Sequence, residues 1–226
     1  LPHPVEPLVN ENVDRFNRRI DYLRVAVTDR CNLRCFYCMP EGGIPLYRHS
    51  EILRYEEILH VIRAAVSVGI TKVRITGGEP LIRQDICELV RQISRIPQIA
   101  DLAMTTNGIL LDKMAAPLFD AGLKRINVSL DTLNPLTFFK ITRCNRFQDV
   151  WKGLNRAASV GFHPIKINTV VVRNVNDMEI GSLARMSMGK AYNIRFIEFM
   201  PMGCDGQWQP DRFVSSNDMK KQIERI

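Results

Sequence analysis

Short strand-like runs alternate with helix-like segments along most of this chain, and this alternation limits the possible folds more than any other feature. The strand-like runs cover residues 22–28, 72–76, 101–106, 124–130, 164–172 and 193–199. The helix-like segments lie around residues 55–68, 83–95, 112–121, 147–160 and 177–187. Because such alternation builds βαβ units, it predicts an α/β fold with a parallel sheet of about six βα units. A closed eight-unit barrel needs about 250 residues, so we expect a partial, open TIM-type barrel.

The strands of this predicted sheet carry polar side chains on one face. Parallel strands that are covered on both faces read as continuous apolar runs. Here polar and apolar residues alternate, and successive side chains of a strand point to opposite faces. One face then carries four cations: Arg24, Lys72, Arg74 and Lys166. This basic face predicts a wet cavity that holds an anionic ligand. The alternative is that each cation pairs with a buried carboxylate or extends outward to solvent.

Three of the six cysteines follow the first predicted strand within eight positions. Cys31, Cys35 and Cys38 have the spacing C-x3-C-x2-C. Three thiolates in one loop can bind three irons of a [4Fe–4S] cluster, whereas an electron-transfer cluster uses four cysteines. The open fourth iron indicates that another molecule binds there, as at catalytic zinc sites.

Two alternatives to an open cluster remain for this motif. One is a zinc site. The other is a cluster completed by a distant cysteine, for which the candidates are Cys87, Cys144 and Cys204. Cys87 lies in an apolar helix-like run, which favours a buried small hydrophobe, and plain thiols are expected for the other two.

A glycine pair follows the second predicted strand, in the run Thr76-Gly77-Gly78-Glu79-Pro80. Glycine lets a backbone approach a ligand closely and exposes its amides and carbonyls. A simple turn would also use glycine, so this run by itself is only suggestive.

Together these runs resemble the radical SAM superfamily, whose members cleave S-adenosylmethionine (SAM) at an iron–sulfur cluster. Further runs closely resemble the GTP 3′,8-cyclase family of molybdenum cofactor (molybdopterin) biosynthesis. They are TDRCNLRCFYCMP, KVRITGGEPLIR, MTTNG, INVSLDT, PIKINTVV and RFIEFMP, and the similarity extends from about residue 14 to residue 203.

The resemblance implies roles for individual residues. Cys31, Cys35 and Cys38 would bind the [4Fe–4S] cluster, and SAM would bind its open iron through amino and carboxylate groups. The expected SAM-binding residues are Tyr37, Gly78, Ser129 and Met200. The expected GTP-binding residues are Arg24, Arg74, Thr105 and Lys166, three of which belong to the basic face. No general acid or base is assigned.

The resemblance also implies a lyase reaction. A 5′-deoxyadenosyl radical from SAM would take hydrogen from C3′ of GTP, and the ribose radical would close a ring on C8 of guanine. The product is (8S)-3′,8-cyclo-7,8-dihydroguanosine 5′-triphosphate, the first intermediate of molybdopterin synthesis. Expected partners are GTP, a reducing electron donor and the downstream cyclic pyranopterin phosphate synthase, and a homodimer is an open option.

The family's C-terminal part has no counterpart in these 226 residues. That part carries a second three-cysteine [4Fe–4S] cluster, an Arg-x-Arg element and a terminal Gly-Gly. We therefore expect a truncated cyclase with an N-terminal arm (1–19), a radical SAM partial barrel (20–210) and the start of a C-terminal region (211–226). The alternatives are another radical SAM enzyme, one that modifies peptides, and a non-catalytic metal-binding fragment.

The overall composition fits these expectations. The net charge of +7 indicates an anionic partner. No apolar run reaches the roughly 18 residues of a membrane span, and the N-terminal residues do not resemble a secretory signal. We expect neither a membrane nor a nucleic acid as partner. The expected location is the cytoplasm, or an organellar matrix if a targeting segment has been removed.

Overall fold

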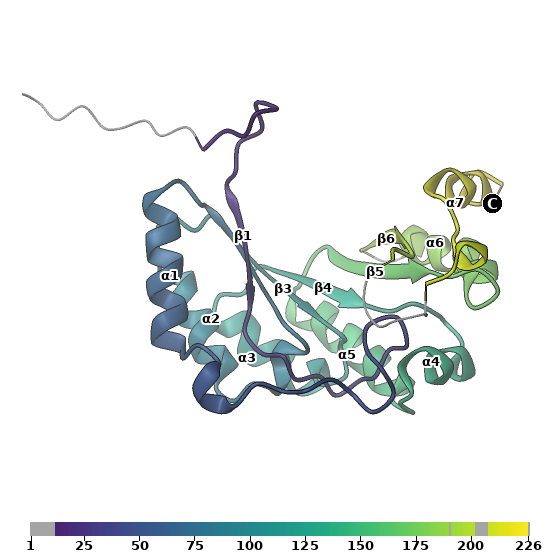
Figure 1. Cartoon of the computed structure of the whole chain (residues 1–226), viewed down its shortest axis with the longest axis horizontal. Coiled ribbons are helices and arrows are strands. Elements are labelled where there is room, and N and C mark those ends of the chain that lie inside the picture. The colour runs from purple at the N-terminus through teal and green to yellow at the C-terminus, as the bar shows by residue number, and fades with distance from the viewer. Residues whose placement is uncertain (1–11, 190, 202–207, 226) are drawn as a thin grey trace, which may run out of the picture.

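A six-stranded parallel sheet organises the chain (Figure 1). The computed structural model describes residues 12–189, 191–201 and 208–225. The strands are β1 (Tyr22–Ala26), β2 (Lys72–Thr76), β3 (Asp101–Thr106), β4 (Arg125–Ser129), β5 (Ile165–Val171) and β6 (Tyr192–Glu198). They lie side by side in chain order, and each neighbouring pair is parallel. In the described part of the chain β1 and β6 are edge strands, so the predicted partial barrel is confirmed.

Within the described residues, seven α-helices connect or flank these strands. Their bounds are α1 (Tyr55–Ser67), α2 (Ile86–Ser94), α3 (Leu111–Asp120), α4 (Pro135–Thr142), α5 (Phe147–Val160), α6 (Ile180–Gly189) and α7 (Ser216–Ile223). Single 3-10 turns occur at His49–Glu51, Pro80–Ile82, Asp177–Glu179 and Pro210–Arg212. No helix in the described ranges is long and apolar enough to cross a membrane.

Helix α4 is missing from the sequence-based expectation. The side chain of Asn134 accepts hydrogen bonds from the amides of Leu136 (2.8 Å) and Thr137 (3.1 Å), and Pro135 occupies the first turn. An Asn cap followed by proline is a strong start signal, so the helix could have been predicted from this pair.

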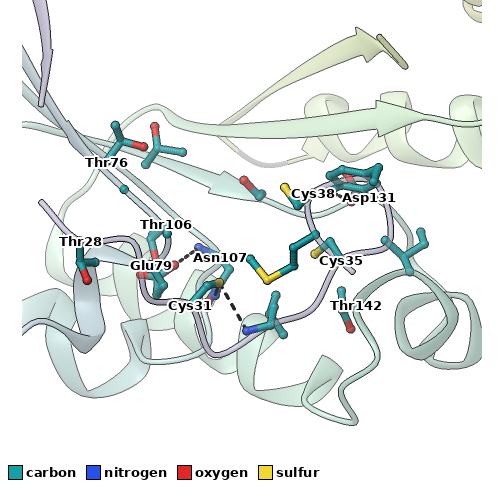
Figure 2. A pocket seen from close by; sticks show the side chains of 18 of the residues that line it. Thr28, Cys31, Cys35, Cys38, Thr76, Glu79, Thr106, Asn107, Asp131 and Thr142 are labelled. Carbon is teal, nitrogen blue, oxygen red and sulfur yellow. Dashed lines mark hydrogen bonds between the residues drawn. The ribbon is translucent and has the colours of Figure 1, made fainter. Parts of the chain in front are cut away.

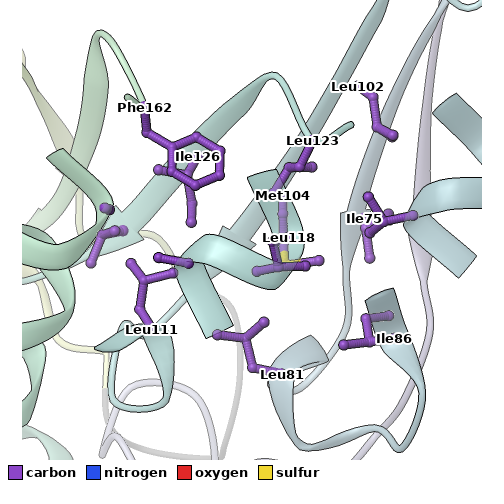
Figure 3. Close-up of a cluster of buried hydrophobic side chains, with 14 of the residues drawn as sticks. Ile75, Leu81, Ile86, Leu102, Met104, Leu111, Leu118, Leu123, Ile126 and Phe162 are labelled. Carbon is purple, nitrogen blue, oxygen red and sulfur yellow. The ribbon is translucent and has the colours of Figure 1, made fainter. Parts of the chain in front are cut away.

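The hydrophobic core lies between one face of the sheet and helices α1, α2, α3 and α5 (Figures 1 and 3). Val73 and Ile75 of β2 are buried, whereas Lys72, Arg74 and Thr76 on the opposite face are only partly buried. Strand β5 alternates in the same way along its whole length. The predicted alternation between an apolar and a polar face is therefore confirmed. Burial of each large aliphatic side chain contributes about 1.5–3 kcal/mol of stability.

Gly153 brings helix α5 close to the start of α3, and its replacement by alanine should destabilise the fold. A Cβ atom there would lie 2.5 Å from the carbonyl oxygen of Gly108 and 2.9 Å from Cβ of Leu111. Such overpacking costs about 1–3 kcal/mol, more than the gain of up to about 1 kcal/mol in helix propensity. We expect chemical denaturation of Gly153→Ala to show a lower free energy of unfolding.

Gly189→Ala is the matched control for this prediction. Gly189 is the last residue of helix α6, and no atom lies within 4 Å of the added Cβ position. The control should be at least as stable as the parent chain, because the added methyl group meets no atom and alanine favours the helix. Equal stability of the two variants would show that the α3–α5 contact tolerates a methyl group.

Candidate functional site

A cavity of about 490 Å³ lies at the C-terminal ends of the first four strands (Figure 2). Its walls come from the residues that end or follow β1 to β4 and from the cysteine loop after β1. Barrel enzymes place their sites at this end of the strands, because the loops that follow the strands converge there. The position of the cavity thus marks the candidate site.

All three cysteines of the motif line this cavity. Cys31 and Cys35 are half-buried and Cys38 is exposed. Burial raises the pKa of the Cys31 thiol, and burial followed by the nearby Asp131 carboxylate raises the pKa of Cys35 strongly. Bound iron would reverse this effect, because a metal's positive charge deprotonates a coordinating thiol.

The three cysteines lie around one cavity (Figure 2). Among the residues that the structure describes, no three His, Cys, Asp or Glu side chains are placed to hold a single metal ion. Thiols spread around a cavity suit a cluster of several irons, and three of them leave one iron open. The residues present therefore fit a [4Fe–4S] cluster with an open coordination site.

Helix α4 supports the cysteine loop through backbone hydrogen bonds. The amides of Arg34 and Phe36 donate to the carbonyl oxygens of Thr142 (3.0 Å) and Ile141 (2.9 Å) at the end of the helix. The Arg143 guanidinium donates to the carbonyl oxygen of Arg34 (3.0 Å). The helix that the sequence reading missed is thus part of the support for the cysteines.

The glycine pair packs against the segment that leads into the cysteine loop. The amide of Gly78 donates to Thr28 O and that of Glu79 to Arg30 O, both at 2.7 Å. A Cβ atom on Gly78 would lie 2.1 Å from Arg30 O, and Gly77 has a φ of +149°. Gly78 also lines the cavity, but its close backbone approach is to the chain itself.

Gly78→Ala should therefore separate these two segments and shift Cys31. We expect a lower iron content after anaerobic reconstitution and a lower unfolding temperature. Gly42→Ala is the control, because nothing lies within 4 Å of the added atom. If Gly78→Ala matched Gly42→Ala in iron content and stability, the proposed backbone contact would be unimportant.

Glu79 joins the ends of β2 and β3 at the cavity wall. It is 1 % exposed and accepts hydrogen bonds from the Thr106 hydroxyl (2.7 Å) and from the amides of Asn107 (2.7 Å) and Leu81 (3.0 Å). Burial raises the pKa of its carboxyl group, and these hydrogen bonds oppose that rise. Asn107 in turn donates to Asn32 in the cysteine loop (2.7 Å).

The polar face of the sheet carries more cations than the sequence reading named. Arg125 of β4 and Arg195 of β6 also lie near Arg74 and Lys166, close enough for their positive charges to repel those of the other two. Burial lowers the pKa of Arg74, and the surrounding cations add to this effect. The pKa of Lys166 is lowered for the same reasons. The strand alternation that placed Arg74 on this face also applies to Arg125 and Arg195.

Two cations of this face have carboxylate partners. Lys72 Nζ lies 2.8 Å from Asp21 Oδ2, and Arg125 Nε donates to Asp101 Oδ1 at 2.7 Å. Lys72 therefore has a carboxylate partner, as the alternative predicted, but the pair is partly exposed rather than buried.

Several buried polar atoms on this face lack hydrogen-bond partners within the described ranges. They are Nε of Arg74, Nδ2 of Asn127 and Oδ1 of Asn168. An unsatisfied buried group costs about 1–3 kcal/mol. Because native proteins rarely retain such groups without a reason, they indicate ordered water or a polar ligand at this face.

The structure brings many of the predicted site residues together. The cavity is lined by all three cysteines and by Tyr37, Gly78, Thr105 and Ser129. Arg24, Arg74 and Lys166 lie on the same sheet face but outside the cavity lining. Met200 is 48 % exposed and is not a lining residue. Cys87 and Cys144 pack against the core, and Cys204 lies outside the described residues.

Sequence reasoning assigned no role to Glu79, Asn107 or Asp131, which also line the cavity. All three directly follow a predicted strand or its glycine turn. That position was the available signal, because strand ends meet at one edge of a parallel sheet.

Comparison with known proteins agrees with this geometry. The family model described as "Radical SAM superfamily" matches residues 25–186. A GTP 3′,8-cyclase of Thermodesulfovibrio yellowstonii is 51 % identical over 93 % of this chain and 66 % of its own length. A GTP 3′,8-cyclase of Alkaliphilus oremlandii is 46 % identical over 94 % of this chain and 67 % of its own length.

Solved structures share the fold. Streptococcus suis SuiB is 20 % identical with a TM-score of 0.68, over 91 % of this chain and 45 % of that chain. This chain spans about two thirds of the length of the curated relatives. It belongs to the radical SAM superfamily and, within it, to the family of the GTP 3′,8-cyclases.

Proposed function

We propose that this chain is the radical SAM core of a lyase that cyclises GTP to (8S)-3′,8-cyclo-7,8-dihydroguanosine 5′-triphosphate. The observation that carries the proposal is the partly buried side chain of Arg74, whose buried Nε has no partner and whose neighbours include Lys166 and Arg195. Arg74 precedes the cavity-lining Thr76 by two residues on the same strand face. A group of cations thus lies about 7 Å along the strand from the cavity that holds the three thiols.

In this proposal each group of residues has a separate task. Cys31, Cys35 and Cys38 hold the [4Fe–4S] cluster, and Tyr37, Gly78, Ser129 and Met200 contact SAM. GTP is contacted by Arg24, Arg74, Thr105 and Lys166. When bound, the cluster and SAM supply one-electron chemistry that the amino-acid side chains cannot perform.

The chain itself binds and orients the nucleotide. The fork of an arginine side chain matches phosphate oxygens in a bidentate manner, and lysine adds a point charge. Burial and then mutual repulsion lower the pKa of Arg74 and Lys166, and an anionic triphosphate would relieve the repulsion among them and Arg195. A peptide substrate would leave these charges without anions, so we favour the nucleotide.

An isotope experiment tests this proposal. The chain is reconstituted anaerobically, reduced chemically and supplied with SAM and GTP that carries deuterium at C3′. We expect deuterium in the 5′-deoxyadenosine, and none with ATP labelled at the same position. Unlabelled 5′-deoxyadenosine formed independently of GTP would contradict GTP cyclisation. No cleavage of SAM by a chain with an intact cluster would contradict radical SAM chemistry altogether.

Other expectations remain proposals that accompany this function. They are an electron donor, the downstream cyclic pyranopterin phosphate synthase as partner, a homodimer and a cytoplasmic location. The division into an arm (1–19), a partial barrel (20–210) and the start of a C-terminal region (211–226) also remains a proposal. A second [4Fe–4S] cluster is expected only outside this chain.

A further inference from the structure

We infer that Asp131 is a positioning residue that fixes the cysteine loop against the sheet through the hydroxyl group of Tyr37. The inference rests on the proposed function, because it assumes that Cys35 and Cys38 bind the cluster. Tyr37 lies between these two cysteines, and Asp131 follows β4, far away along the chain. Both side chains line the cavity.

Asp131 is itself held firmly where the pairing of β4 with β5 ends. The amide of Leu130 still donates to Asn168 O (3.0 Å), but Leu130 O accepts the Thr169 hydroxyl (2.7 Å) instead of a strand amide. The next β5 amide, that of Val170, donates to Asp131 Oδ1 (2.8 Å). The carboxylate thus takes the place of a backbone acceptor in the ladder.

The main chain of Asp131 is fixed as well. Buried Asn176 donates from Nδ2 to both Asp131 O (2.7 Å) and Val170 O (2.8 Å). Asp131 is 7 % exposed. One carboxylate oxygen and the main-chain carbonyl oxygen of Asp131 are therefore already hydrogen-bonded. The other carboxylate oxygen then points in a defined direction.

That other oxygen accepts the Tyr37 hydroxyl at 2.5 Å. The Tyr37 ring also packs edge-on against Phe36, with ring centroids 5.6 Å apart. This side-chain bond ties the Cys35–Cys38 segment to the end of β4. Hydrogen bonds to an ionised acceptor are the strong ones, so this bond should hold the two cysteines at their cluster-binding spacing.

Cluster retention in the folded protein distinguishes positioning from a merely structural role. The parent chain, Tyr37→Phe, Asp131→Asn and the double variant are reconstituted anaerobically without SAM. Iron transfer to bathophenanthroline disulfonate is then timed while circular dichroism reports the fold. We expect each single variant to release iron about 10-fold faster. The double variant should be no faster than the faster single variant, because both substitutions remove the same bond from the Tyr37 hydroxyl to an ionised acceptor.

Tyr55→Phe is the matched control. Its hydroxyl donates to Gln84 O at 2.6 Å, and Tyr55 does not line the cavity. This variant should keep the release rate and the electron paramagnetic resonance spectrum of the parent chain, whereas Tyr37→Phe should change both. A merely structural bond would lower the unfolding temperature and leave the release rate of the folded protein unchanged.

The outcomes separate this inference from the proposed function. Parent-like release rates in folded Tyr37→Phe and Asp131→Asn, or additive effects in the double variant, would overturn the inference alone. If Tyr37→Phe does not fold, Asp131→Asn decides by the same criterion, because it keeps the shape of the side chain. A parent chain that takes up no iron would overturn the proposed function and this inference with it.

Discussion

Replacement of Cys31, Cys35 or Cys38 by serine should remove the iron–sulfur cluster and SAM cleavage together. Each variant is expected to contain little iron and sulfide after anaerobic reconstitution and to form no detectable 5′-deoxyadenosine. The reason is that in the proposed site each cysteine would ligate a different iron of a cluster that has no spare protein ligand. Iron and sulfide analysis, together with chromatography of the SAM products, measures both effects.

The Cys35→Ser variant is the strictest test of this prediction. The thiol of Cys35 is half-buried beside the carboxylate of Asp131, and both influences favour the neutral thiol when no metal is bound. A hydroxyl group at this position cannot compensate, because serine does not ionise near neutral pH. Cys87→Ala on α2 is the control, since Cys87 does not line the cavity. Full iron content in Cys35→Ser would contradict the assignment of this ligand.

Arg74→Ala should weaken GTP binding by about 10- to 100-fold. A hydrogen bond to a charged group contributes about 1.5–3 kcal/mol, and each 1.4 kcal/mol is a factor of ten in affinity. Equilibrium dialysis with GTP at low and high salt measures the loss, which should be larger at low salt because ions screen the attraction. Arg91→Ala is the control, because Arg91 lies on α2 in an exposed ion pair with Glu88.

The same substitution should not destabilise the ligand-free chain. Arg74 is partly buried among Arg24, Arg125 and Arg195, so its removal relieves repulsion and leaves no unpartnered Nε. Lower affinity without loss of stability is the signature of a residue kept for a ligand. Unchanged GTP affinity, or an unfolding temperature well below that of the parent chain, would contradict this role.

Local patterns were enough to predict the sheet, its polar face and the cysteine motif. Alternation along β2 and β5 separates the apolar from the polar side chains without any long-range information. The same rule covers Arg125 and Arg195, which the sequence reading overlooked. Helix α4 was overlooked because its start signal lies in the two residues Asn134-Pro135 rather than in its apolar pattern.

Contacts between distant segments could not be predicted in this way. The pairing of Lys72 with Asp21 depends on how β2 meets the residue before β1. The bond from Tyr37 to Asp131 depends on where the ladder between β4 and β5 ends. The role of Gly78 was interpreted as approach to a ligand, whereas its closest neighbours are Arg30 and Asp29. Each of these depends on strand register, which a single sequence does not give.

The support of the cysteine loop by helix α4 has a consequence for the synthesis of the protein. Thr142, which accepts a hydrogen bond from the loop, leaves the ribosome roughly 100 residues after Cys38, a delay of about 5–20 s at usual elongation rates. During that interval the thiols are exposed on a nascent chain without their scaffold. Insertion of iron and sulfide is therefore expected to follow translation of the first four strands and helix α4, and the delivery machinery should recognise a folded structure rather than an unfolded cysteine motif.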